Sequence, residues 1–310
     1  MKVLVTGSKG LVGSSVVKVL QRSEKVSEVF TSSRNDTNLF NFEETKKLIE
    51  DVQPDTLVNC AARVGGIFAN NTHRSDFILE NLKINMNLLE ACIPNNKIRI
   101  INLGSSCIYP LNAENPISEE YFMTGKLEPT NSPYAIAKIT GIEIGRSIKK
   151  QFGHNILNLM PTNLYGPNDY FSPLDSHVIP GLISRMHLSK LDGEDQFIVW
   201  GTGKPLREFM FVDDLSSSIE FMIDKEWKHD LLNVGTNSEV SILELGNLIK
   251  KIIGYQGNII FDNTKPDGNP RKLLNSDLIT SMGWNPSVSL EKGLEITYKW
   301  YLENFRNTRK

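Results

Sequence analysis

The sequence predicts an α/β fold, a doubly wound parallel sheet with a smaller C-terminal α/β lobe. The chain opens with an apolar strand, Lys2 to Val5, and regularly spaced glycines separate it from an amphipathic helix that ends near Leu20. Helical and strand patterns then alternate along the first half of the chain. The strands in this alternation are almost wholly apolar, which indicates a parallel sheet covered by helices on both faces.

Length and composition narrow the class of protein. The chain has 310 residues, 40% hydrophobic and 23% charged, which is typical of a globular protein of one large or two moderate domains. The net charge of −2 gives no basic excess, so we expect no nucleic-acid partner. No apolar run approaches the roughly 20 residues of a membrane span, so we expect no membrane partner. The three cysteines, without a C-x-x-C pair, indicate a reducing cytoplasm and neither disulfides nor a metal site.

Gly7, Gly10 and Gly13 form a G-x-x-G-x-x-G pattern between the first strand and the first helix. Gly7 permits the tight turn, Gly10 lets the backbone approach a pyrophosphate at the helix N-terminus, and Gly13 allows close packing of helix and strand. In this context the pattern indicates a Rossmann-type dinucleotide-binding fold. A plain glycine-rich turn is the alternative.

The second predicted strand, from about Val26 to Ser32, ends in small hydroxyl side chains followed by Arg34. An NAD-preferring fold usually has Asp or Glu here, which accepts hydrogen bonds from the ribose hydroxyls. A cation with hydroxyls suits a 2′-phosphate instead, and Lys9 in the glycine loop supplies a second cation. The pocket therefore favours NADPH as cofactor. The alternative is that Arg34 merely faces solvent.

The next elements place further residues at the same edge of the sheet. We expect a helix over 43–52, a strand over 55–59, a helix over 77–92 and a strand over 98–103. Ligands of parallel sheets bind beyond the carboxyl ends of the strands. Gly7, Ala61 and Ser105 follow three of these strands, and the small side chain of Ala61 lets a cofactor lie against it.

The segment from Asn131 to Lys138 predicts a helix start that bears a chemical pair. Asn131 or Ser132 is expected to cap the helix. Tyr134 and Lys138 are four residues apart, so both project from one face, and the cation is expected to lower the pKa of the phenol. Such a tyrosine exchanges a proton with an alcohol or a carbonyl, and Ser105 is placed to meet it. A surface lysine beside a half-buried tyrosine is the alternative.

The alternation loosens in the second half of the chain. Residues 1–165 are the predicted NADP-binding domain, and residues 166–310 are expected to form mainly a substrate-binding lobe, with segments that return to the sheet. The planar fork of Arg207 suits a nucleotide diphosphate, although a surface ion pair with Glu208 or Asp213 is an alternative. Lys272 is a further candidate for binding the sugar or the phosphates.

Longer motifs accompany the glycines, the serine and the Tyr-x-x-x-Lys pair. They are the segments 63–71 (RVGGIFANN), 104–110 (GSSCIYP), 160–169 (MPTNLYGPND), 176–180 (SHVIP) and 199–203 (VWGTG) with 207–209 (REF). With them the chain resembles the extended short-chain dehydrogenase/reductase family over essentially its whole length, and within it the 3,5-epimerase/4-reductases of nucleotide sugars. The resemblance implies NADPH-dependent conversion of GDP-4-keto-6-deoxy-D-mannose to GDP-L-fucose. A GDP-sugar is therefore the expected partner, and a homodimer the expected assembly.

The resemblance also assigns roles to individual residues. The reductase triad falls on Ser105, Tyr134 and Lys138, and the epimerase pair falls on Cys107 and His177. A Cys107 thiolate is a competent base and His177 a competent acid near neutral pH. The alternatives are a packed, hydrophobic cysteine and a loop histidine satisfied by backbone. The predicted cofactor contacts are Gly7, Lys9, Gly10, Gly13, Arg34, Ala61, Tyr134, Lys138, Pro161, Asn163 and His177. The predicted substrate contacts are Asn163, Arg185, Trp200, Arg207 and Lys272.

Three positions depart from the family pattern. Arg63 stands where a lysine is common, Lys9 where an arginine is common and Asn41 where an aspartate is expected. These departures affect cofactor details rather than the chemistry. Two other functions remain open: a 4-reductase of a related GDP-keto-sugar with partial or no epimerase activity, and an NADP(H)-binding sensor or scaffold. The intact proton donor argues against the second, because binding alone does not need one.

Overall fold

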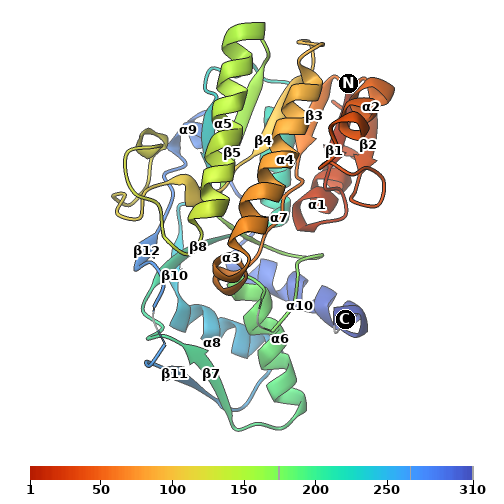
Figure 1. Ribbon diagram of the computed structural model, residues 1–310. Coiled ribbons are helices and arrows are strands. Elements are labelled where there is room, and N and C mark those ends of the chain that lie inside the picture. Colours follow the sequence, from red (N-terminus) through yellow and green to blue (C-terminus); the bar gives the residue numbers. More distant parts are fainter. Residues whose placement is uncertain (174, 266, 309–310) are drawn as a thin grey trace.

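The main sheet is parallel and doubly wound, as the sequence predicts (Figure 1). In residues 1–173, 175–265 and 267–308, which the computed structural model describes, its six strands lie in the order β2-β1-β3-β4-β5-β9. They are β1 (Lys2–Thr6), β2 (Glu28–Ser32), β3 (Thr56–Asn59), β4 (Arg99–Leu103), β5 (Ile156–Pro161) and β9 (Leu231–Val234). The strand order reverses between β1 and β3, because β2 lies on one side of β1 and all later strands on the other. Ligands bind at such a reversal, beyond the carboxyl ends of the strands.

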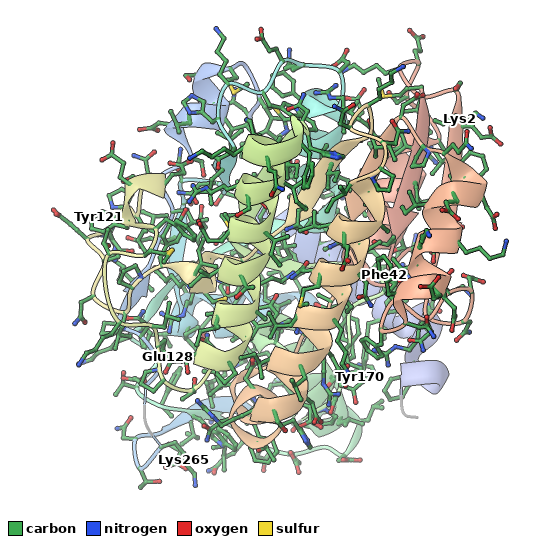
Figure 2. All side chains as sticks on the ribbon, turned by 45° about the horizontal axis from the view of Figure 1, so that its top comes forward. Lys2, Phe42, Tyr121, Glu128, Tyr170 and Lys265 are labelled. Atoms are coloured by element: carbon green, nitrogen blue, oxygen red, sulfur yellow. The ribbon has the colours of Figure 1, made fainter. Side chains whose placement is uncertain are left out.

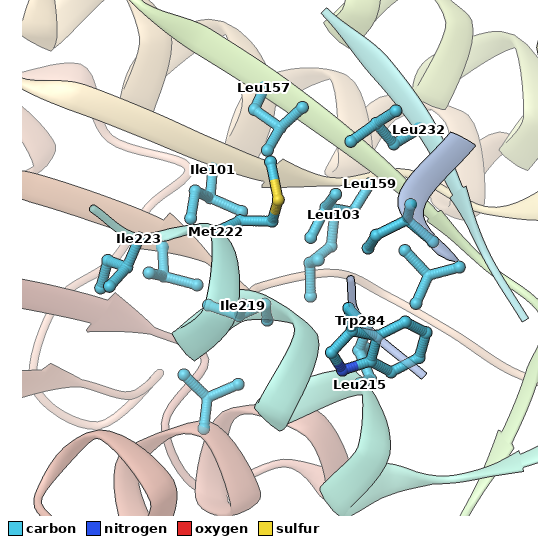
Figure 3. Packing of buried hydrophobic residues seen from close by; sticks show 14 of the residues in the cluster. Ile101, Leu103, Leu157, Leu159, Leu215, Ile219, Met222, Ile223, Leu232 and Trp284 are labelled. Atoms are coloured by element: carbon cyan, nitrogen blue, oxygen red, sulfur yellow. The ribbon is translucent and has the colours of Figure 1, made fainter. Parts of the chain in front are cut away.

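Helices cover both faces of the main sheet. On one face lie α1 (Leu11–Leu20) and α7 (Val212–Met222), and on the other lie α2 (Phe42–Val52), α4 (Arg74–Cys92) and α5 (Ser132–Phe152). Successive strand residues alternate between the two buried clusters, so Ile101 packs towards α7 whereas Ile100 packs towards α4. Figure 3 shows the first cluster, with Ile101, Leu103, Leu157 and Leu159 of the sheet near Leu215, Ile219 and Met222 of α7.

A row of buried asparagines crosses the sheet. Asn59, Asn102 and Asn158 stand in register on β3, β4 and β5, and each is at most 3% exposed. The side chain of Asn59 donates to Asn102 (2.9 Å), and that of Asn102 donates to Asn158 (3.2 Å). Asn59 also donates to Asn85 of α4 (3.3 Å), whose amide donates to the carbonyl of Ala137 in α5 (3.4 Å). The row therefore specifies the register of three strands and connects them to α4 and α5.

A smaller lobe lies below the carboxyl edge of the main sheet in Figure 1. One of its sheets contains β6 (Asn163–Tyr165), β8 (Leu206–Phe211), β10 (Glu239–Ser241) and β12 (Arg271–Lys272), and a second pairs β7 (Gln196–Trp200) with β11 (Asn258–Asp262). Its helices are α6 (Val178–Leu191), α8 (Ile242–Ile253) and α10 (Leu290–Thr308), which pack around an aromatic core. From the same half of the sequence, α7, β9 and α9 (Asp277–Ser281) return to the main sheet. Within the described ranges, no helix is long and apolar enough to cross a membrane.

The chain differs locally from the predicted elements just before α4. The helix predicted over 77–92 begins earlier, at Arg74, and it follows the short helix α3 (Ile67–Thr72), which the sequence pattern did not indicate. Polar contacts rather than an apolar stripe hold α3, because the Asn70 side chain donates to the carbonyls of Gly65 (2.8 Å) and Gly66 (3.0 Å). Hydrophobic periodicity therefore gave no signal for this helix.

We expect Asn102→Leu to lower the free energy of unfolding by about 2–4 kcal/mol, because it leaves a buried donor on Asn59 and a buried acceptor on Asn158 without this partner. Chemical denaturation followed by circular dichroism measures the change. Asn258→Leu, at an exposed position of β11, is the matched control and should change stability by less than about 0.5 kcal/mol. Equal stability of Asn102→Leu and wild type would show that the row contributes nothing to folding.

Candidate active site

A cavity of 1200 Å³ lies between the carboxyl edge of the main sheet and the smaller lobe. Every residue predicted for cofactor, substrate or catalysis lines it. These residues are Gly7, Lys9, Gly10, Gly13, Arg34, Ala61, Ser105, Cys107, Tyr134, Lys138, Pro161, Asn163, His177, Arg185, Trp200, Arg207 and Lys272. A typical small-molecule pocket has roughly 300–1,000 Å³. The cavity therefore has room for more than one ligand.

The glycine loop forms a narrow cradle at one end of the cavity. Gly7 has φ +66°, and a Cβ there would lie 2.8 Å from the backbone of Ala61; a Cβ on Gly13 would lie 2.2 Å from the carbonyl oxygen of Gly7. Gly10 is more open, since a Cβ there would meet the Gly7 carbonyl at 3.5 Å. Gly10 is also the N-cap of α1, and the first N–H groups of a helix have no intrahelical partners. This backbone fits a pyrophosphate.

The predicted 2′-phosphate site lies at the rim of the cavity, beside the glycine loop. Lys9 and Arg34 both line the cavity, and the side chain of Arg34 is 78% exposed, with its guanidinium 4.0 Å from Glu80. Such an exposed ion pair is weak, so Arg34 can turn towards a phosphate. Ser33 is less available, because its N–H and its hydroxyl donate to Asp36 at 2.9 and 2.6 Å. The two cations are therefore the groups that suit a 2′-phosphate.

The start of α5 is built differently from the prediction (Figure 2). Asn131 occupies the N-cap position, as predicted, and Ser132 is the first helical residue, but the Asn131 side chain makes no cap hydrogen bond. Glu128, at the foot of α5 in Figure 2, holds the turn instead: its carboxylate accepts from the N–H groups of Thr130 (3.0 Å) and Asn131 (3.1 Å). Arg74 of α4 donates to the hydroxyl of Ser132 at 3.2 Å. Two charged side chains therefore determine how the chain enters the helix.

Lys138 places an ammonium group in the wall of the cavity. It is 3% exposed, and its Nζ donates to the carbonyl of Leu103 at the end of β4 (2.7 Å). Burial lowers the pKa of Lys138 to about 8, and the neighbouring thiols of Cys107 and Cys60 partly oppose the drop. Nζ lies 5.7 Å from the ring centre of Tyr134. The predicted pair therefore does lie on one face of α5.

The predicted lowering of the Tyr134 pKa is wrong. Burial raises the pKa of Tyr134 well above its usual value, the neighbouring Cys107 raises it further, and a hydrogen bond with Ser105 opposes the rise. The ring of Phe77 packs edge-on against Tyr134, with 6.3 Å between centroids, and contributes to this burial. The ammonium of Lys138 is bonded to a backbone carbonyl rather than to the phenol. Tyr134 therefore keeps its proton and is suited to donate it.

Cys107 and His177 both line the cavity, but their pKa values shift against the predicted roles. Cys107 lies in the short 3-10 turn η1 (Ser106–Ile108), and its N–H donates to Ser105 Oγ (3.3 Å). Burial raises the pKa of its thiol, whereas Lys272, the Ser105 hydrogen bond and Lys138 lower it. His177 is the N-cap of α6; desolvation lowers the pKa of its imidazole, and a hydrogen bond with the backbone of Gly65 opposes this. Near neutral pH the uncharged form of each group therefore predominates, and the thiolate and the imidazolium are the minor forms.

The smaller lobe supplies polar and aromatic groups to the cavity. Arg185 of α6 lies 5.1 Å over the ring of Phe197 and donates to the carbonyl of Ile198 (3.2 Å). Trp200, at the end of β7, is 57% exposed and borders the cavity. The side chain of Asn163 donates to the carbonyl of Glu208 (2.8 Å). These residues lie where a ligand could extend from the main sheet into the lobe.

Arg207 and Lys272 bring two cations together on neighbouring strands. They stand opposite each other in the pairing of β8 with β12, and burial lowers the pKa of both. The alternative ion pair of Arg207 with Glu208 is not what the structure shows. Arg207 donates to the carbonyl of Leu206 (2.8 Å), while the fully buried Glu208 accepts from backbone N–H groups, among them that of Leu274 (3.1 Å). The guanidinium of Arg207 is thus available at the cavity wall.

Phe77, Glu128 and Asp267 are among the cavity residues that the sequence did not predict for the site. The carboxylate of Asp267 accepts from the N–H (2.8 Å) and the hydroxyl (2.7 Å) of Thr202. Glu128 could have been identified from the sequence, because it precedes the Pro-Thr-Asn turn that leads into the predicted helix. No sequence pattern could have identified Phe77 as a site residue, because its contact with Tyr134 depends on the packing of α4 against α5.

Comparison with known proteins agrees with this geometry. The model of the NAD dependent epimerase/dehydratase family matches residues 3–235. The chain is 44% identical to GDP-L-fucose synthase 1 of Arabidopsis thaliana over 99% of this chain and 94% of that protein. It is 42% identical to the GDP-L-fucose synthase of Escherichia coli strain K12, over 98% of this chain and 97% of that one. A solved GDP-L-fucose synthetase of Naegleria fowleri bound to NADP has a TM-score of 0.88 at 27% identity, over 100% of this chain and 96% of that one. The chain therefore belongs to the NAD dependent epimerase/dehydratase family, within the extended short-chain dehydrogenases/reductases.

Proposed function

We propose that the protein catalyses the NADPH-dependent 3,5-epimerisation and 4-reduction of GDP-4-keto-6-deoxy-D-mannose to GDP-L-fucose. One observation carries the proposal: a protonated tyrosine beside a buried lysine shares a cavity with a cysteine and a histidine. The first pair suits reduction of a ketone, and the second suits proton transfer at carbon. The names of the relatives support the same substrate.

NADPH is the proposed cofactor, and when bound it supplies the hydride for C4 of the sugar. The glycine cradle and the N-terminus of α1 would hold its pyrophosphate, with Ala61 alongside. Lys9 and Arg34 would pair with the 2′-phosphate at the cavity edge. The other proposed contacts are Tyr134, Lys138, Pro161, Asn163 and His177. The relative that was solved with NADP bound supports this choice of cofactor.

Cys107 and His177 are the proposed base and acid of epimerisation. The 4-keto group of the sugar acidifies the hydrogens on C3 and C5. The thiolate of Cys107 takes one of these protons, which leaves an enolate, and protonated His177 returns a proton to the carbon from the opposite face. The carbon is inverted, and the two side chains recover their starting states by exchanging protons with water. The hydroxyls of Ser105 and Tyr134 would hydrogen-bond the enolate oxygen.

Tyr134 is the proposed proton donor of the reduction. As C4 gains a hydride its oxygen gains negative charge, and the phenol gives its proton to that oxygen. Lys138 then stabilises the phenolate that Tyr134 becomes, and Ser105 holds the reacting oxygen. Burial suits this role, because it keeps Tyr134 protonated until the oxygen needs the proton. On the lobe side, Arg185, Arg207 and Lys272 would bind the diphosphate, and Trp200 and Asn163 the rest of the GDP-sugar.

We also propose a homodimer that forms through α4 and α5. The two helices lie side by side at the surface in both Figure 1 and Figure 2, and they expose Leu79 (53%), Met86 (47%) and Ile136 (44%). Apolar side chains gathered on adjacent helices suit a self-complementary interface. A monomer in light scattering would contradict this assembly. The three cysteines are free thiols, which supports our proposal of a cytoplasmic location.

Tyr134→Phe should lower the turnover of reduction by about 10²–10⁴, the usual scale of acid–base catalysis, because it removes the proton donor and keeps the ring. The assay follows NADPH oxidation with GDP-4-keto-6-deoxy-D-mannose and identifies the product sugar by NMR. Fluorescence titration with NADPH is the control and should show little change in affinity. Near-normal turnover would refute the role of Tyr134, and NADPH binding without any turnover in the wild type would favour the sensor or scaffold.

Cys107→Ser should abolish exchange of the C3 and C5 hydrogens with deuterium oxide, because a serine hydroxyl does not ionise near pH 7. Proton NMR of the substrate without NADPH measures the exchange. Cys60→Ser, at the other cysteine that borders the cavity, is the matched control and should retain it. If Cys107→Ser still incorporates deuterium fully at C3 and C5, Cys107 is only a packing residue. A wild-type protein that reduces the ketone without any exchange would be a 4-reductase of a related GDP-keto-sugar.

The rate of reduction should decline above about pH 8. Burial lowers the pKa of Lys138 to about 8, so above that pH the side chain loses its proton, and with it the cation that stabilises the Tyr134 phenolate. The decline should approach tenfold per pH unit, roughly as expected for one essential proton. The measurement is kcat against pH at saturating NADPH and sugar. A decline that begins only near pH 10, the roughly unperturbed value of lysine, would contradict the effect of burial.

A further inference from the structure

Cys107 has to lose a proton before it can take one from carbon, and its burial opposes that loss. The residue is 6% exposed, and burial raises the pKa of the thiol. A thiol in such surroundings is mainly protonated near pH 7 and is a poor base. If Cys107 is the base of the proposed function, another group has to offset the burial.

Lys272 reaches the cavity from a strand whose position is well determined. β12 pairs with β8, and Lys272 stands opposite Arg207. Two residues further along, the N–H of Leu274 donates at 3.1 Å to the carboxylate of Glu208, which is 0% exposed. A buried carboxylate that anchors the chain at this point leaves the strand little freedom to shift. The ammonium of Lys272 therefore projects from a defined part of the wall.

The same segment is bonded to the chain that continues from Cys107. The N–H of Ile117 donates to the carbonyl of Leu273 (2.8 Å), and Leu274 shares a buried cluster with Ile108, the residue after Cys107. These contacts join the η1 turn to the chain that follows β12. Cys107 and Lys272 both line the cavity, and these contacts fix the segments that carry them relative to each other.

Charged and titratable groups from several elements line the same cavity as the thiol. Lys138 and Tyr134 lie on α5, Lys272 on β12, His177 at the start of α6, Arg207 on β8 and Glu128 in the turn before α5. Burial has the largest effect on the pKa of Cys107 and raises it; Lys272 comes next and lowers it, ahead of Ser105 and Lys138. Lys138 already donates to the carbonyl of Leu103, so part of its charge is engaged there. Lys272 is thus the cation with the greatest influence on the thiol.

We propose that the ammonium of Lys272 stabilises the thiolate of Cys107 and so makes it the base of epimerisation. This role differs from holding a diphosphate, because it acts on the protein before any sugar binds. The effect is mutual: burial and the neighbouring Arg207 lower the pKa of Lys272, whereas Cys107, ahead of Glu128, raises it. Ammonium and thiolate therefore favour each other in a wall where either charge alone would be costly.

Alkylation by iodoacetamide reports the thiolate directly, since the sulfur anion displaces iodide to form a thioether and the thiol does not react. The full chain is alkylated over a range of pH without sugar, and mass spectrometry of the digest gives the rate at Cys107 alone. Lys272→Met should lower that rate near neutral pH about tenfold, which corresponds to one unit in the thiol pKa. Lys272→Arg should keep most of the wild-type rate, because it keeps the charge.

Arg271→Met is the matched control. Arg271 is the neighbouring cation on β12, but it is paired with Glu239 at the surface (2.8 Å), so its loss should leave the rate at Cys107 unchanged. NADPH binding by fluorescence titration verifies that each variant is folded. If Lys272→Met fails that check, Lys272→Gln, which also removes the charge and keeps a polar side chain, takes its place with the same expected loss.

An unchanged alkylation profile in the neutral variant, together with a higher KM for the GDP-keto-sugar, would overturn the proposal and leave Lys272 as a substrate ligand. Failure of the proposed function gives a different result. In that case Lys272→Met would still slow alkylation of Cys107, which supports the pair, but the wild type would not exchange the substrate's hydrogens with deuterium oxide.

Discussion

The buried ammonium of Lys138 is the constraint on which the rest of the site depends. A charge that is 3% exposed is tolerated only where it finds strong partners, and Lys138 finds the carbonyl of Leu103 at 2.7 Å. That bond attaches α5 to the carboxyl end of β4, so the helix that bears Tyr134 is held against the strand that leads to Ser105. The asparagine row connects the same two elements deeper in the sheet. The catalytic geometry thus follows from the need to satisfy buried polar groups.

The same burial drives the titratable groups of the cavity towards their neutral forms. It raises the pKa of Tyr134 and Cys107 and lowers that of Lys138, while His177, which is exposed at the cavity, has its pKa lowered by partial desolvation there. For Tyr134 neutrality is useful, because a donor needs its proton. For Cys107 it is a handicap, because a base must first give its proton away. One environment therefore suits the proposed reduction directly, whereas the proposed epimerisation needs help from nearby cations.

Features that follow from backbone sterics and helix periodicity could be predicted from the sequence. Side-chain pKa values and hydrogen bonds that depend on the folded packing could not. Gly13 was predicted because no other residue allows that approach of helix and strand, and Tyr134 with Lys138 because residues four apart share a helix face. The predicted direction of the Tyr134 pKa was wrong, because burial in the folded chain, to which Phe77 of α4 contributes, raises it. Asn131 takes the N-cap position but makes no cap hydrogen bond, because its backbone (φ −116°, ψ 8°) is not in the extended conformation that capping requires. Both misses depend on the folded backbone and its packing, which the spacing of residues does not specify.

The two halves of the proposed chemistry rest on different parts of the fold. The reductase residues lie on α5 and directly after β4, so their geometry depends on the core of the main sheet. His177 and Lys272 instead come from α6 and β12 in the smaller lobe, and their placement depends on contacts between the layers. One such contact is the hydrogen bond from the N–H of Gly66 to the carbonyl of Asp175 (3.0 Å), beside the epimerase acid. We expect a change at these contacts to affect the proposed proton transfer at carbon more than the positions of Ser105, Tyr134 and Lys138, which the main sheet holds. A common sheet can therefore serve sugars that differ in whether C3 and C5 are inverted.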